Sequence, residues 1–261
     1  MGDGALVRIT ALVRQDVRLL MRDYTPLLVR TVMPLLIMGF MQPLFRAALR
    51  AGGEAADANG AEQGVPGMAV MFLFFMVNII GLSMFREHGW NTWDRLRAST
   101  ARPVELLAAR LVVPLAAAVF QLAVIFVVGG LLFGLQVSGS YLGLVVVALP
   151  LALCVVMLGM ALVALCRTLS QLLVIANILA LVFAGLGGAL TPQSAMPDWA
   201  GPFAPAAPSY WAMRGFNEVI LRGGGVADVL LPAAVLCAFA AGLAVVALAF
   251  FRAESRKLSY S

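Results

Sequence analysis

Charged side chains are what this sequence has least of. They make up 12% of the 261 residues, whereas soluble domains average about 25% charged residues. Hydrophobic residues make up 62%, whereas the average in soluble domains is about 45–50%. Lys257 is the only lysine, and His88 is the only histidine. So few charges cannot form the hydrated surface of a water-soluble domain. The composition therefore predicts a polytopic membrane protein with one domain, residues 1–261.

Several kinds of chemistry are excluded by missing residues. The sequence has no GxxxxGK[ST] loop, and glycines 223–225 are followed by Val-Ala-Asp, which cannot hold a nucleotide phosphate. A single histidine excludes a histidine-rich metal site and a Ser/His/Asp triad. Cys154, Cys166 and Cys237 lie in apolar runs and are expected to be buried hydrophobic residues. We therefore expect no enzyme activity, metal or cofactor on this chain.

Long apolar runs are what the sequence has instead. About 20 apolar residues cross a bilayer, and the runs predict an all-α protein with six transmembrane helices: 27–45, 67–85, 104–133, 142–166, 169–189 and 229–251. The run 141–190 carries one charge, Arg167, and is too long for one span, so it must fold back there. Pro34 and Pro43 are expected to bend the first span or loosen its ends.

Two further segments are expected at the membrane surfaces. Residues 6–24 combine an apolar stripe with arginines on the opposite face, which predicts an interfacial amphipathic helix. Residues 191–222 contain five prolines and an aromatic cluster, which predicts external re-entrant or surface helices before the last span. A short helix is expected from Ser209 to Leu221, with Ser209 as its N-cap. The Gly-rich stretch 51–67 is expected to be a flexible outside loop.

The arginines predict the orientation of the spans. Basic loops stay on the cytosolic side, which explains the net charge of +5 without nucleic acid. With both termini inside, the cytosolic segments hold most of the basic residues: Arg8, Arg14, Arg18, Arg22, Arg30, the arginines of 86–110, Arg167, Arg252, Arg256 and Lys257. The outside segments hold only Arg46, Arg50, Arg214 and Arg222.

The basic, polar stretch 86–110 also carries a resemblance. Its Glu87, Gly89, Thr92, Arg95, Leu96 and Ala98, followed by Glu105, resemble the cytosolic loop of ABC-2-type exporter permeases. The resemblance implies that residues 87–103 form a coupling helix that docks on an ATPase subunit. The coupling residues it implies are Glu87, Gly89, Thr92, Trp93, Arg95, Leu96 and Arg97. The stretch MRDYTPLLVRTVMPLLIM resembles the drug- and antibiotic-resistance branch of the family.

The same resemblance implies the partners and the location. Two permease chains, identical or paralogous, would pair in the bacterial cytoplasmic membrane, in contact with membrane lipid. Two separate ABC ATPase subunits would bind ATP and Mg.

The predicted spans contain neutral polar residues in place of midplane charges. Proton- or sodium-driven carriers usually need such a charge, so that class is disfavoured. Candidates for the substrate pathway are Gln42, Phe75, Asn78, Gln121, Asn177 and Phe183. For the amides, hydrogen bonding between helices is an alternative that we weigh above substrate contact.

Three functions remain open from the sequence. The first is a permease subunit of an ATP-driven exporter of hydrophobic or amphipathic molecules. The second is the same fold exporting a polysaccharide or lipid-linked glycan. The third belongs to another class, a non-transporting membrane scaffold or a membrane-embedded enzyme.

Overall fold

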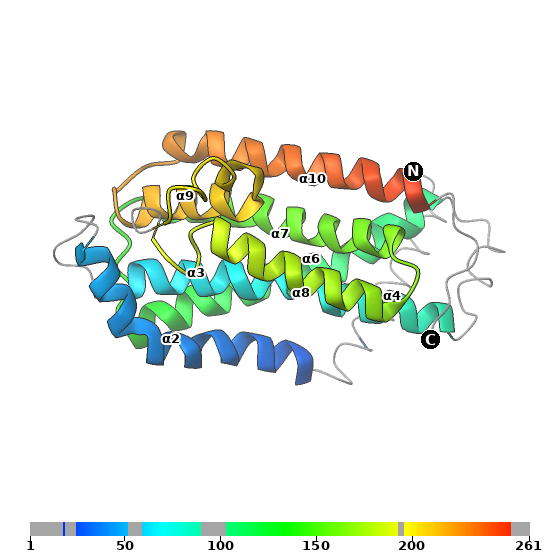
Figure 1. The fold of residues 1–261 in the computed structure, drawn as a ribbon, viewed down its shortest axis with the longest axis horizontal. Helices are drawn as coiled ribbons and strands as arrows, with labels where there is room; N and C mark the ends of the chain where they lie inside the picture. Colours follow the sequence, from blue (N-terminus) through cyan, green and yellow to red (C-terminus); the bar gives the residue numbers. More distant parts are fainter. Residues whose placement is uncertain (1–17, 19–24, 52–58, 90–102, 193–195, 252–261) are drawn as a thin grey trace.

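The computed structural model describes residues 18, 25–51, 59–89, 103–192 and 196–251, and all regular structure in these ranges is helical (Figure 1). The helices are α2 (Thr25–Ala51), α3 (Ala61–Phe74), α4 (Val77–Gly89), α6 (Pro103–Phe133), α7 (Tyr141–Leu165), α8 (Leu169–Leu186), α9 (Pro208–Ile220) and α10 (Leu230–Phe251). Two 3-10 helices, η2 (Ala204–Ala206) and η3 (Ala227–Val229), flank α9. Six segments of the described chain are long and apolar enough to cross a membrane, with α3 and α4 forming one of them. The predicted fold class is confirmed.

The six spans lie roughly along the long axis of the bundle and alternate in direction (Figure 1). The beginning of α2 lies at the same end of the bundle as the end of α4, the beginning of α6 and the end of α10. The short helix α9 lies beside α7 and α10, within the opposite half of the bundle. This is the arrangement expected of spans that start and finish on one side of a membrane.

Helix α3 is the core of the bundle, because every one of its residues is buried. Helix α7 is buried along much of its length. By contrast, α2 and α8 expose large apolar side chains, among them Phe40, which is 80% exposed, and Ile178, which is 55% exposed. An exposed apolar face of this kind suits contact with lipid or with another membrane helix.

The outer end of the first two spans is more helical than the sequence predicted. Helix α2 continues through Pro34 and Pro43 to Ala51, beyond the predicted end at residue 45. Helix α3 begins at Ala61, within the stretch 51–67 that the sequence predicted to be a flexible loop. The side chain of Asn59 accepts a hydrogen bond from the N–H of Ala61 (2.7 Å), and the Glu62 carboxylate accepts from the N–H groups of Asn59 and Gly60 (3.1 Å each). These side chains satisfy the free N–H groups of the helix start.

The segment before the last span also differs in detail. Helix α9 begins at Pro208, and its N-cap is Ala207 without a side-chain hydrogen bond, so Ser209 is not the N-cap. Proline suits the first helical position because its missing N–H is not needed there. The Ser209 hydroxyl instead donates to the carbonyl oxygen of Phe183 in α8 (2.5 Å). Helix α8 ends at Leu186, ahead of the predicted residue 189.

Candidate functional site

Four of the six predicted pathway residues lie on the second and fifth spans, which pack against each other. Asn78 lies in α4, one residue after the helix begins, and its side-chain Nδ2 donates a hydrogen bond to Oδ1 of Asn177 in α8 (2.8 Å). Asn78 is half-buried and Asn177 is exposed. This amide pair joins the second and fifth spans; Oδ1 of Asn78 is buried without a hydrogen-bond partner among the described residues, and the accessible side chain of the pair is that of Asn177.

Two further predicted pathway residues are aromatic and lie on the same two spans. Phe183 is six residues after Asn177 in α8, and its ring meets that of Phe74 edge to face at a centroid distance of 5.3 Å. Phe75 meets Phe72 in the same manner at 5.8 Å. Phe75 and Phe183 are both half-buried. We define Asn78, Asn177, Phe75 and Phe183 together as the Asn–Phe strip.

Helices α4 and α8 also approach each other closely beyond the amide pair. A Cβ atom added to Gly81 of α4 would collide with the side chain of Leu172 in α8. Helices α4 and α8 run in opposite directions (Figure 1), and Phe183, Asn177 and Leu172 follow one another towards the beginning of α8. The second and fifth spans thus meet at three places, Phe74–Phe183, Asn78–Asn177 and Gly81–Leu172.

The two remaining predicted pathway residues lie elsewhere. Gln121 in α6 is fully buried, and neither of its side-chain polar atoms has a hydrogen-bond partner among the described residues. Gln42 donates from Nε2 to the carbonyl oxygen of Phe133 (3.3 Å). Its contact is therefore to the backbone at the end of α6.

Gln42 belongs to a polar cluster that joins three helix ends. Nδ2 of Asn59 donates to the carbonyl oxygens of Phe133 and Gly134 (3.2 and 2.8 Å), and Nε of Arg46 donates to the carbonyl oxygen of Asn59 (3.1 Å). A Cβ atom at Gly60 would collide with the Gln42 carbonyl oxygen. This cluster holds the ends of α2 and α6 against the beginning of α3.

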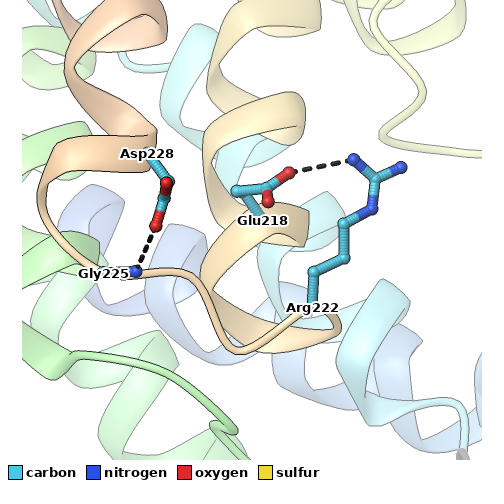
Figure 2. A network of polar contacts seen from close by, with 4 residues as sticks. All are labelled: Glu218, Arg222, Gly225 and Asp228. Carbon is cyan, nitrogen blue, oxygen red and sulfur yellow. Dashed lines mark hydrogen bonds and ion pairs between the residues drawn. The ribbon is translucent and has the colours of Figure 1, made fainter.

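A second polar cluster lies between α9 and α10 at the same end of the bundle (Figure 1). Figure 2 shows the ion pair of Arg222 with Glu218 (2.9 Å) and the hydrogen bond from the N–H of Gly225 to Asp228 (2.8 Å). An exposed pair four residues apart contributes little stability, about 0.3–0.5 kcal/mol. The contacts shape the turn and point to no ligand.

The aromatic cluster expected near this surface is partly ordered by α9. The indole N–H of Trp211 donates to the carbonyl oxygen of Pro205 (2.9 Å), and its ring meets that of Tyr210 edge to face. Trp199 and Phe203 are exposed. Amphipathic aromatic side chains in such positions suit the membrane–water interface.

Most of the predicted coupling residues lie outside the described residues. These are Thr92, Trp93, Arg95, Leu96 and Arg97, and the amphipathic segment 6–24 lies outside as well except for residue 18. Glu87 and Gly89 belong to the last turn of α4. The end of α4 and the beginning of α6 lie at one end of the bundle (Figure 1), and residues 90–102 lie between these two helices in the sequence.

The sequence did not reveal two features of this site. The second span is interrupted at Phe75 and Met76, although neither proline nor glycine occurs there. Buried Gln63 of α3 donates from Nε2 to the carbonyl oxygen of Gly188 (2.7 Å), which fixes the turn after α8. For the second feature the sequence offered one signal, because Gln63 is a polar residue beside an apolar run; for the first it offered none.

Comparison with known proteins adds the family. The family model described as ABC-2 type transporter matches residues 7–221, which include the first five spans, the Asn–Phe strip and the stretch 87–103. No curated protein matches the chain.

Proposed function

Because the chain belongs to the ABC-2 type transporter family, we propose that it is the permease subunit of an ATP-driven exporter of hydrophobic or amphipathic molecules. Members of this family are membrane components that work with ABC ATPase partners. The proposal adds the export direction, the substrate class, and an assembly of two permease chains with two ATPase subunits in the bacterial cytoplasmic membrane. ATP and Mg belong to the ATPase subunits.

The observation that carries the substrate class is the Asn–Phe strip. It combines one amide pair with two half-buried aromatic rings on an otherwise apolar surface. A binding surface that is mostly apolar with few, fixed polar groups suits a molecule with a large hydrophobic part and a small polar part. Drug-like or lipid-like molecules have this character.

A polysaccharide or lipid-linked glycan is the second candidate within the same family. Sugars present many hydroxyl groups, each of which needs a hydrogen-bond partner once it leaves water. The strip offers a single amide pair, which favours the amphipathic molecule over the glycan. The drug-resistance branch is favoured by the resemblance of residues 21–38.

The stretch 87–103 supplies the proposed coupling to the ATPase. Helix docking into a groove depends on a few apolar anchors, and buried aromatic residues often dominate. Trp93 and Leu96 are the anchors that this stretch offers, and Glu87 would pair with a basic residue. Displacement of this stretch by ATPase closure would reach the spans through α4 and α6, which flank it.

The test is copurification of the ATPase with the permease, followed by ATP hydrolysis in nanodiscs. Replacing Trp93 and Leu96 with Ala should cost about 2–4 kcal/mol of docking, which is at least about a 30-fold loss of affinity. Glu87→Gln should keep the ATPase bound and lower stimulated hydrolysis. A matched control replaces Trp199 and Leu131, both exposed at the other end of the bundle, and should behave as the unmodified chain.

Retention of docking and stimulated hydrolysis by the Trp93/Leu96 variant would contradict the coupling role. The substrate class is tested in the same preparation. Ethidium should stimulate hydrolysis, and Asn78→Ala or Phe183→Ala should reduce that stimulation. Stimulation by a lipid-linked glycan alone would favour the second candidate.

A further inference from the structure

The second span changes its hydrogen-bond pattern in the middle of the bundle. Between α3 and α4, the N–H groups of Met76, Asn78 and Ile79 donate to carbonyl oxygens three residues earlier, at distances of 2.9, 3.2 and 2.9 Å. The α-helical hydrogen-bond pattern resumes at Ile80, whose N–H donates to the carbonyl oxygen of Met76, four residues earlier. A short 3-10 turn inside a helix often marks a hinge. Kinks usually have a proline or glycine as their cause, and neither occurs at residues 73–80.

The outer part of the span is fixed on all sides. All residues of α3 are buried, and a Cβ atom at Gly67 would collide with the carbonyl oxygen of Ala189. Gln63 binds the neighbouring carbonyl of Gly188. Close packing of this kind does not deform gradually. Helix α3 therefore forms a rigid support for the turn at Phe75 and Met76.

The inner part of the span is less enclosed and is linked to α8. Leu82 and Ser83 of α4 are exposed. The link consists of the Asn78–Asn177 hydrogen bond and, deeper, the close approach of Gly81 to Leu172. In an apolar environment an amide pair has few competing partners, so this bond favours joint movement of α4 and the inner half of α8.

We propose that Phe75–Met76 is a hinge in the second span and that Asn78 and Asn177 are positioning residues that make α4 and α8 move together about it. The inference rests on the proposed function, because displacement of the cytosolic end of α4 would come from the ATPase. The same movement changes the Asn–Phe strip, since Asn78 lies on the α4 side of the hinge and Phe183 contacts Phe74 on the α3 side. Movement of the ATPase would thus reach the proposed substrate surface through the joint movement of α4 and α8.

The test measures distances between spin labels in the permease–ATPase complex. The background carries Cys154→Ala, Cys166→Ala and Cys237→Ala, and labelled chain is diluted into unlabelled chain. One label pair, at Arg50 and Ser83, spans the hinge. A reference pair, at Arg50 and Leu131, reports on the outer ends of α2 and α6. All three sites are exposed.

A third pair, at Ser83 and Val174, reports on α4 against α8. Trapping the ATPase with ADP and vanadate should change the Arg50–Ser83 distance by about 1–2 Å, a typical helix shift. The reference pair and the Ser83–Val174 pair should keep their distances. With Asn177→Ala, the Ser83–Val174 distance should change on trapping, because α8 no longer follows α4. The matched control is Ile178→Ala, which removes an exposed neighbour on the same helix.

The outcomes separate this inference from the proposed function. Trapped nucleotide with an unchanged Arg50–Ser83 distance would overturn the hinge and leave the function standing. A normal response of the Asn177→Ala variant would overturn the role of the amide pair. Failure of any ATPase to copurify or trap nucleotide would overturn the proposed function and this inference with it.

Discussion

At the residue scale, the amide side chains of the spans have different environments although the sequence presents them alike. Asn78 and Asn177 bind each other, and Gln63 binds the backbone of Gly188, although the amide oxygens of Asn78 and Gln63 are buried without a partner in the described chain. Gln121 is fully buried with both polar atoms unpaired in the described chain. A buried polar group without a partner costs about 1–3 kcal/mol. The stabilising or destabilising effect of each amide therefore depends on its neighbours.

This difference predicts opposite effects of one substitution at two sites. Gln121→Met keeps the side-chain volume and removes the unpaired amide, so it should stabilise the protein by about 1–3 kcal/mol. The matched change Gln63→Met removes the bond to Gly188 and should destabilise it by about 1 kcal/mol or more. The measurement is the midpoint of heat-induced aggregation in detergent. A lower midpoint for Gln121→Met would mean that this amide has a partner, such as an internal water.

At the element scale, helices and turns approach closely where glycine removes the side chain. A Cβ atom at Gly67 would collide with the carbonyl oxygen of Ala189, and one at Gly139 would collide with that of Gly224. The second contact accompanies hydrogen bonds from the N–H groups of Ser138 and Ser140 to Ile220 and Gly224. The α6–α7 loop is thereby fixed to the turn shown in Figure 2.

Alanine substitutions test the tighter of these approaches. Gly67→Ala should destabilise the α3–α8 junction by about 1–3 kcal/mol, because backbone must move to admit the methyl group. The control is Gly242→Ala in α10, where nothing lies within 4 Å of the added atom. At that position the better helix propensity of alanine should raise the free energy of unfolding by at most about 1 kcal/mol. Equal melting midpoints for the two variants would contradict the close packing of Gly67.

At the scale of the whole molecule, the alternating spans and the basic segments determine the orientation. The α6–α7 loop lies at one end of the bundle, and the turn between α7 and α8, which carries Arg167, lies at the other (Figure 1). The positive charge of Arg167 predicts that the second of these loops lies in the cytosol. The structure also restricts where the orientation can be probed, because a side chain at Gly139 would collide with Gly224.

Cysteine labelling tests this orientation without disturbing the packing. In the cysteine-free background, Gln136→Cys in the α6–α7 loop should react with an impermeant maleimide in intact cells. Ser170→Cys, at the beginning of α8, should react only after lysis. Both side chains are exposed. Labelling of position 170 in intact cells would reverse the predicted orientation.

The sequence by itself determined the membrane class, the number of spans, and the resemblance carried by residues 87–105. These follow from composition and local pattern, because a bilayer requires long apolar helices and basic loops remain inside. Span ends were less predictable. Asn59 and Glu62 extend the second span outward through capping contacts that the Gly-rich stretch around them conceals.

Only the tertiary structure decided which polar residues meet. Asn78 and Asn177 are far apart in the sequence, and their pairing depends on the antiparallel packing of α4 and α8. The interruption at Phe75 and Met76 likewise has no local signal, because the residues there are ordinary in membrane helices. A long apolar run shows that a helix crosses the membrane, but all faces of such a helix are apolar. Its partners and its bends are therefore set by contacts with the other helices.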